Sequence, residues 1–402
     1  MDNLRECTIK EIVRQYPETL EVFINNGFAI FAEENALNEL GSILTLKSAL
    51  RTKKIGIEAF VQLIKDKIED TAYYNSLFSL MGGNKPGGFN IHIPCGLKGP
   101  FERKLQTLLQ AIQKNDDNPH HQDIDGIPDL AITKSYHFFN ENFINKFVSK
   151  GLYTAIPRKV VNKQLADLEI VDQKWPFNVI CLGISVIVVD RKRLGDLPMP
   201  KTWGDLLKPE YERKVMINSR GDSFSDAVLL NIYKEYGEEG IALLGRAIHS
   251  GAHSAQMIKG LASSNPDLPP IYIMPDFFAH TISSTTTIEI VWPEDGALVT
   301  PFFFMVKANK VEKFKDLVDF LTGPQVGQIC ANAYFPSVHP DVSNRVPIDA
   351  KFKWLGWDYI KEHDIEALVK KLNNLFLVSY RGDELHNEPS SRERGNLAMG
   401  KA

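Results

Sequence analysis

The sequence predicts an α/β body that follows a small all-α domain. Apolar residues recur at helical spacing between residue 8 and about residue 72. Residues 82–88 have the sequence Gly-Gly-Asn-Lys-Pro-Gly-Gly, and no other run of the chain is so depleted of side chains. Beyond this run, short β-rich segments alternate with helical ones, which is typical of open α/β sheets with parallel strands.

The helices of the first domain have recognisable ends. Thr8 and Glu11 form a capping-box pattern, in which each side chain bonds to the other residue's backbone. A second helix is expected to start near Pro17 and to end at Gly27. We therefore predict a small helical domain over residues 1–80, followed by a linker at 81–88.

The α/β body is expected to contain strands wherever short apolar runs are rich in β-branched or aromatic residues. These segments are 89–94, 129–133, 179–190, 215–218, 271–274, 288–292 and 301–307. Helices are predicted between them, at 99–112, 225–236 and 311–321. The consecutive valines and isoleucine at 186–189 indicate a strand covered on both faces. In sheets of this kind, ligands lie at the carboxyl ends of the strands.

Charge and composition exclude several classes of protein. The 402 residues are 44% hydrophobic and 24% charged, with a formal net charge of -4, so the chain lacks the basic footprint of a general nucleic-acid binder. No stretch approaches the ~20 apolar residues of a membrane span. The first residues lack the apolar run of a secretory signal. We expect a cytoplasmic location, unless a leader was removed, and neither a nucleic-acid partner nor a membrane span.

The cysteines do not form a recognisable motif. Cys7, Cys95, Cys181 and Cys330 are far apart, and no two have the spacing of a metal knuckle or a redox pair. A disulfide framework is therefore not expected, and each cysteine is interpreted as a small buried side chain. No metal and no cofactor is predicted.

Three segments of the body, in order, carry a family resemblance. The first is Pro-Lys-Thr-Trp-Gly-Asp-Leu-Leu-Lys-Pro-Glu-Tyr with a following Lys-Val at 200–215, the second spans 292–306, and the third spans 314–328. Together they resemble the substrate-binding proteins of ABC importers, in the group that includes ferric-iron, spermidine/putrescine and thiamine binders. The resemblance covers about residues 88–350 and is specific for the fold rather than for the ligand.

This resemblance implies a type II periplasmic-binding-protein fold, in which two α/β lobes joined by crossing strands close on a ligand. The first lobe is expected to comprise 89–182 and 293–381, and the second 183–292, with a mobile tail at 382–402. Family precedent implies a small-molecule ligand, an ABC permease as partner, and a periplasmic or extracellular location.

The N-terminal segment has a likeness of its own. Residues 12–28 resemble the small helical domain at the front of iron-centre repair proteins and of some redox proteins. Those domains usually place one or two cysteines just after the glycine, whereas residues 29–32 here are Ala-Ile-Phe-Ala. The resemblance therefore implies a protein partner or dimerisation rather than thiol chemistry.

The turns that follow the predicted strands supply the candidate ligand-binding residues. Gly96 lets the backbone approach a ligand, and Lys98 and Arg220 can neutralise an anion beside helix N-termini, one of which Ser223 or Ser225 can cap. Solvated lysines, capping serines and packed phenylalanines remain alternative interpretations of the same residues. The candidates are Cys95, Gly96, Lys98, Ser135, Tyr136, His137, Arg220, Ser223, Asp276, Phe277 and Phe278.

The turn at 274–280 argues against one ligand of the family. Ferric-iron binders of this group use two adjacent tyrosines near this position, and the matching pair here is Phe277-Phe278. Phenylalanine offers no oxygen to a hard cation, so a tyrosinate iron site is not expected. The two rings are expected to wall an organic ligand, to contact an amine, or to pack in the core. Asp276 and His280 alone do not define a metal site.

Four functions remain open from the sequence. The leading hypothesis is non-catalytic capture of a small polar or anionic ligand by an importer component. A cytoplasmic sensor or carrier on the same fold is the second. The third is an enzyme with Cys95 as nucleophile and His137 or Asp276 as base. The fourth is an interaction scaffold that docks through its N-terminal domain.

Overall fold

The computed structural model describes most of the chain. It covers residues 4–24, 26–53, 55–65, 67–68, 89–114, 128–134, 136–220, 223–263, 265–282 and 287–381. The predicted linker at 81–88 and the predicted tail at 382–402 lie outside the described residues, as does Ser135.

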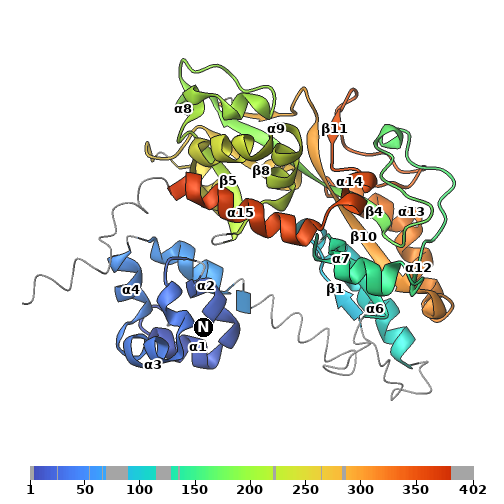
Figure 1. The fold of residues 1–402 in the computed structure, drawn as a ribbon, viewed down its shortest axis with the longest axis horizontal. Helices are drawn as coiled ribbons and strands as arrows, with labels where there is room; N and C mark the ends of the chain where they lie inside the picture. The colour runs from blue at the N-terminus through green and yellow to red at the C-terminus, as the bar shows by residue number, and fades with distance from the viewer. Residues whose placement is uncertain are drawn as a thin grey trace, which may run out of the picture.

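The N-terminal residues form the predicted helical domain (blue in Figure 1). The capping box is confirmed, because the Glu11 N–H donates to Thr8 Oγ1 at 3.2 Å and the Thr8 N–H donates to the Glu11 carboxylate at 2.8 Å. Gly27 has a φ of +90°, the left-handed conformation expected after a helix end. The helices are α1 (Ile9–Gln15), α2 (Leu20–Ile24), α3 (Glu34–Ile43) and α4 (Leu46–Thr52), with short 3-10 turns at Pro17–Thr19 and Ala29–Ala32.

This domain has a hydrophobic core of its own. Phe23 and Phe60 are fully buried with ring centroids 5.5 Å apart, and Phe28 and Phe31 stack beside them at 6.0 Å. Such aromatic contacts add to the burial of apolar area that holds a small domain together.

The strands of the body form a continuous mixed sheet in the described part of the chain. Its order is β1-β2-β10-β4-β8-β5-β6, with β3 and β11 beside β10, β7 beside β5 and β9 beside β4. The strands are β1 (Phe89–Ile91), β2 (Leu130–Thr133), β3 (Tyr153–Thr154), β4 (Asn178–Asp190), β5 (Val215–Arg220), β6 (Ser223–Phe224), β7 (Ile248–Ala252), β8 (Ile271–Pro275), β9 (Ile288–Val291), β10 (Ala297–Lys307) and β11 (Phe352–Lys353).

Two long strands cross between the lobes. The first half of β4 pairs with β10 as far as Ser185, and its second half, from Ser185 to Val189, pairs with β8. The far end of β10 pairs with β2. Lobe I therefore contains β1, β2 and β3, and lobe II contains β5 to β9. The expected parallel pairing holds for β1–β2, β5–β7 and β5–β8, and β10 also pairs in parallel with β11. The two crossing strands run antiparallel to each other, β4 runs antiparallel to β8 and β9, and β10 runs antiparallel to β2 and β3.

Helices cover both faces of this sheet. They are α6 (Pro100–Lys114), α7 (Glu141–Phe143), α8 (Arg191–Leu194), α9 (Asp226–Ala247), α10 (Ser254–Leu261), α11 (Asp276–Ala279), α12 (Lys315–Thr322), α13 (Pro324–Asn332), α14 (Trp357–Glu362) and α15 (Ile365–Arg381). The helix predicted at 225–236 is the first half of α9, because Gly237, with the non-helical angles φ +64° and ψ -158°, interrupts it there. A second helical half follows this kink and ends at Ala247.

The C-terminal helix packs across the body. In Figure 1, α15 (red) runs alongside α9 of lobe II. Phe376 of α15 also packs against Phe224 of β6, with ring centroids 4.4 Å apart.

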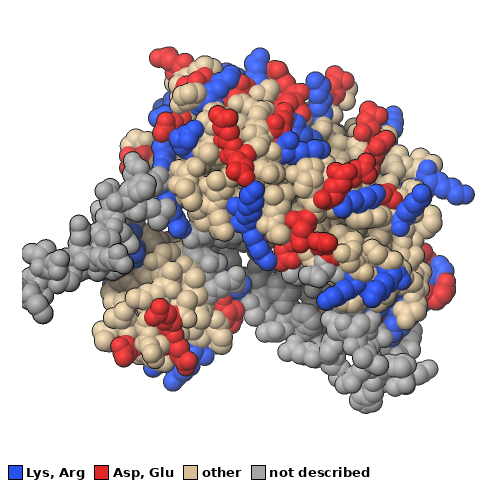
Figure 2. Space-filling view, viewed as in Figure 1, with Lys and Arg blue, Asp and Glu red and all other residues tan. Residues whose placement is uncertain are grey.

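On the visible face, acidic and basic side chains lie interspersed over the body (Figure 2). The predicted boundaries between the lobes stay a prediction.

The cysteines differ in part from expectation. Cys181 and Cys330 are fully buried, as predicted. Cys95 is exposed and Cys7 is half-buried, so the prediction of a buried side chain is wrong for these two residues. Cys95 begins a short 3-10 turn at Cys95–Leu97, and only Leu97 of that turn faces the core.

Candidate functional site

Three segments from the two lobes meet at one place, which we name the interlobe seam. The seam consists of the turn Cys95–Leu97 and residues 334–335 of lobe I, together with residues 276–280 of lobe II. The Phe277 and Phe335 rings stack across it with centroids 5.0 Å apart. A Cβ atom at Gly96 would lie 2.6 Å from the Phe277 ring and 2.8 Å from the Phe335 ring. Only glycine therefore fits at position 96 without moving these rings.

A second ring pair closes the seam. The His280 imidazole stacks on the Tyr334 ring, with centroids 3.9 Å apart and an interplanar angle of 10°. The Arg345 guanidinium lies 5.5 Å from the centre of the same tyrosine ring, within the range of a cation–π contact. Tyr334 has a φ of +62°, a left-handed conformation that costs a bulky residue free energy, so the packing around it must hold it there.

Asp276 is the buried acidic group of the seam. It is 2% exposed, and among the described residues its Oδ1 atom takes part in no hydrogen bond. The nearest cationic candidate is His280, whose Nε2 lies 3.3 Å from Oδ1. A buried carboxylate that lacks hydrogen bonds and a paired cation costs free energy, so Asp276 favours its neutral form.

The pKa directions of this pair show that burial outweighs mutual attraction. Burial raises the pKa of Asp276 to about 7. Burial, with a smaller contribution from Arg345, lowers the pKa of His280. An ion pair that dominated its surroundings would shift both pKa values in the opposite directions. Asp276 and His280 are therefore not a settled salt bridge near neutral pH, and Asp276 can accept or donate a hydrogen bond there.

A second polar cluster lies where the turn after β2 approaches the start of α9. The Tyr136 hydroxyl hydrogen-bonds to the Thr300 side chain of β10, while burial, and to a lesser extent Asp226, raises the pKa of Tyr136. Burial also raises the pKa of Asp226 to about 6, and the charge of Lys134 acts against that rise. Asp226 is the first residue of α9, so this cluster joins residues of lobe I, lobe II and a crossing strand.

The structure brings together some of the predicted site residues. Cys95 and Gly96 lie at the seam with Asp276 and Phe277, and buried Tyr136 belongs to the second cluster. Phe278 instead packs against Phe277 and the His253 ring of its own lobe. The contacts of Phe277 and Phe278 favour the packing interpretation over a free ligand wall.

The remaining predicted residues are less defined. Lys98 is exposed one residue beyond the turn that contains Cys95. Arg220 and Ser223 pair between β5 and β6, and their side chains lie outside what the structure describes, as does that of His137. Of the two serines predicted to cap α9, Ser225 occupies the N-cap position but makes no side-chain capping bond, and Ser223 lies in β6.

Two observations on the described residues concern catalysis and metal binding. Cys95 makes no hydrogen bond to Asp276, one of the two bases considered for it, and the side chain of the other, His137, lies outside what the structure describes. Within the part of the chain that the structure describes, no group of three or more His, Cys, Asp or Glu residues is placed to hold a metal ion. Of the described helices, none combines the length and apolar character that a membrane span requires.

Sequence reasoning missed several residues of these clusters. Asp226, Thr300 and Tyr334 lie outside the predicted turns that supply the candidate ligand-binding residues. Asp226 had a recognisable signal, since an acidic residue opens a long helix after a strand. Tyr334 had none, because its role depends on tertiary packing against His280.

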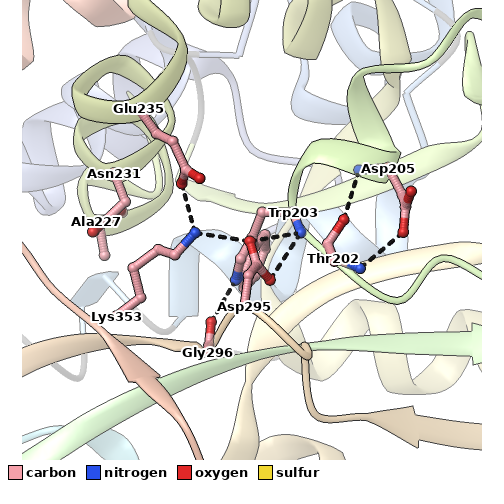
Figure 3. Close-up of polar contacts among 9 residues, drawn as sticks. All are labelled: Thr202, Trp203, Asp205, Ala227, Asn231, Glu235, Asp295, Gly296 and Lys353. Atoms are coloured by element: carbon pink, nitrogen blue, oxygen red, sulfur yellow. Dashed lines mark hydrogen bonds and ion pairs between the residues drawn. The ribbon is translucent and has the colours of Figure 1, made fainter.

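The family motifs at 200–211 and 292–297 form the contact between lobe II and the start of β10, the strand that returns to lobe I (Figure 3). The Trp203 indole N–H donates to the Gly296 carbonyl at 2.8 Å, and the Trp203 backbone N–H donates to the Asp295 carboxylate at 3.3 Å. Lys353 lies between Asp295 at 2.7 Å and Glu235 of α9 at 2.5 Å. Thus the segments at 200–211 and 292–297, far apart in sequence, form one packed unit.

These features define the two-lobed periplasmic-binding-protein fold. Residues 125–363 match the model of the bacterial extracellular solute-binding protein family, which covers more than half of the chain. The chain belongs to this family. Residues 5–61 separately match a domain of unknown function, DUF1858, within the predicted helical domain. No curated protein matches the chain.

One solved structure shows the same fold at low sequence identity, and two others are similar to the chain at lower TM-scores. A two-component system protein described as mediating signal transduction is 15% identical, with a TM-score of 0.50 over 71% of this chain and 99% of its own. A ferric binding protein of Bordetella is 16% identical, with a TM-score of 0.47 over 73% and 98%. The periplasmic binding protein AfuA of Actinobacillus pleuropneumoniae, solved with fructose-6-phosphate, is 12% identical, with a TM-score of 0.48 over 74% and 99%.

Proposed function

We propose that this solute-binding protein captures a small polar or anionic ligand at the interlobe seam, without chemical turnover. The observation that supports the site most directly is Asp276, a buried carboxyl group with an unbonded oxygen at the contact between the lobes. With a pKa near 7, this group accepts a hydrogen bond from a ligand donor when ionised and donates one to an anionic oxygen when protonated.

Capture follows from the lobe arrangement as a population shift. The stacked pairs Phe277–Phe335 and His280–Tyr334 join lobe II to lobe I in the structure. The hinge is expected at β4 and β10, because these two strands connect the sheets of both lobes. A ligand favours the closed state only by the contacts that it makes better there, and hydrogen bonds to Asp276 are such contacts.

The physiological role depends on the compartment. The motif resemblance supports an ABC permease as partner, and the family is extracellular by description. The expected cytoplasmic location would instead fit a sensor or carrier on the same fold. Fractionation of cells that express the full natural gene distinguishes these roles, since an importer component must be found outside the cytoplasmic membrane.

The site is tested by ligand discovery followed by one substitution. Native mass spectrometry of protein purified from cells, with a thermal-shift screen of polar metabolites, identifies the ligand. At a hundredfold its dissociation constant, a ligand adds about 2.7 kcal/mol to the free energy of unfolding. We expect Asp276→Asn to lose most of that shift.

The matched control is Asp316→Asn, which changes an exposed aspartate of α12. This variant is expected to keep the full ligand-induced shift. Equal ligand affinity in Asp276→Asn and wild type would place the site elsewhere. A protein that binds none of the compounds and purifies without a bound small molecule would contradict capture itself.

A further inference from the structure

Two cysteines that are far apart in sequence meet inside lobe I. Cys181 lies in β4 and Cys330 in α13, and both are fully buried in the same hydrophobic cluster. Their thiols lie within hydrogen-bonding reach of each other. Cys7 and Cys95 are not buried in this way. The spacing of the cysteines along the chain gives no hint of this pair.

The backbone holds the two positions in a fixed relation. A β-bulge opposite Phe302 and Phe303 turns both Ile180 and Cys181 toward the cluster that contains α13. The chain that leaves α13 then returns along β4, where the Leu182 N–H donates to the Pro336 carbonyl at 2.9 Å and the Val338 N–H donates to the Ile180 carbonyl at 3.3 Å. These bonds flank Cys181 and fix α13 against it.

We propose that Cys181 and Cys330 are a redox-modification site that forms an intramolecular disulfide when the protein folds in the presence of a low-molecular-weight disulfide. One cysteine thiolate attacks the oxidant, forms a mixed disulfide and releases one small thiol. The second cysteine then displaces the other small thiol. The two protein thiols lose two electrons and two protons in total, and the oxidant is reduced to two thiols.

The bond has a consequence at the interlobe seam. The helix α13 ends at Asn332, two residues before Tyr334, and Tyr334 and Phe335 contact His280 and Phe277 of lobe II. A bond from Cys330 to the crossing strand therefore anchors the lobe I side of the seam. It also restricts the unfolded chain by closing a long loop, which stabilises the folded state. Because burial raises the pKa of the Cys181 thiol, oxidation is slow once folding is complete.

The test uses the full chain with Cys7 and Cys95 replaced by serine, so that only the buried pair remains. The protein is refolded with oxidised and reduced glutathione, then denatured and treated with iodoacetamide. We expect no alkylated cysteine by intact mass, two after prior reduction, and a linked peptide that contains both residues. The melting temperature of the oxidised protein should exceed that of the reduced protein by several degrees.

Cys330→Ala in the same background is the matched control. Its single remaining thiol should be recovered in alkylated or glutathionylated form, and its melting temperature should not respond to the oxidised glutathione. Recovery of both thiols as alkylated cysteines from correctly refolded two-cysteine protein would overturn the proposal. A cross-linked protein that melts below its reduced form would overturn the proposed anchoring.

Discussion

At the scale of single residues, burial sets the chemistry of the seam more than charge pairing does. Asp276 Oδ1 and His280 Nε2 lie 3.3 Å apart. Burial nevertheless raises the pKa of Asp276 and lowers the pKa of His280, so both groups favour their neutral forms. Desolvation of a titratable group costs folding free energy, and groups whose pKa is shifted in this way are concentrated at functional sites. This is why we place the ligand contact at Asp276.

The pH dependence of stability follows from Asp276. The pKa of an aspartate in the unfolded chain is about 3.9, and in the folded protein it is about 7. The folded state therefore holds a proton that the unfolded state has released, and stability falls as pH rises from about 4 to about 8. We expect Asp276→Asn to remove this fall, on the order of 2–4 kcal/mol, in urea denaturation measured across that range.

His280 opposes this trend below about pH 6.5, because its lowered pKa favours the folded state as pH rises there. The comparison is therefore made between variants at each pH. Asp316→Asn should retain the wild-type slope. A wild-type slope in Asp276→Asn would show that its carboxyl group is ionised throughout.

Gly96 gives a second prediction at the residue scale. A methyl group at this position would overlap the Phe277 and Phe335 rings, so Gly96→Ala is expected to lower the free energy of unfolding by about 1–3 kcal/mol. Gly56→Ala is the control, because no atom lies within 4 Å of the Cβ position there. Equal stability of the two variants in chemical denaturation would mean that the rings do not close on Gly96.

At the scale of elements, much of the architecture could be predicted from local patterns. The apolar run in β4 and the capping box of α1 are local signals, and both were correctly interpreted. No helix was predicted after residue 328, although α15 buries Ile365, Leu372 and Phe376 on one face. These residues recur at helical spacing, so the signal for this helix was local and was overlooked. Its position against α9 could be known only from the folded structure.

The candidate site was less predictable than the fold, because its contacts are formed between the lobes. Turns after strands can be located in the sequence, which led to Gly96, Asp276 and Phe277. Contacts between lobes depend on the final packing, so Tyr334 and Asp226 could not be associated with the site from their positions in the chain.

The network of Figure 3 supports a prediction at this scale. Lys353 bridges Asp295 and Glu235 with only 20% of its side chain exposed. Lys353→Met leaves both carboxylates without this partner, and we expect a loss of about 1–2 kcal/mol in the free energy of unfolding. Lys315→Met, which breaks the exposed pair with Asp319, should cost less than about 0.5 kcal/mol. Indistinguishable denaturation midpoints for the two variants would contradict a structural role for the bridge.

At the scale of the whole molecule, the chain combines a two-lobed body with a helical domain at its N-terminus. The helical domain has a hydrophobic cluster that shares no residue with the clusters of the body. The body owes its two-lobed form to β4 and β10, which exchange pairing partners along their length. Solute capture is therefore expected to be a property of the body, while the role of the N-terminal domain with a protein partner stays a prediction.

Closure of the lobes on a solute is the central claim, and a distance measurement tests it most directly. Spin labels at the exposed positions Gln110 of α6 and Lys259 of α10, with Cys7 and Cys95 replaced by serine, report on lobe I and lobe II respectively. With the ligand found by native mass spectrometry, pulsed electron paramagnetic resonance should show a shift of the population toward the shorter interlobe distance. An unchanged distance distribution at saturating ligand would contradict the account.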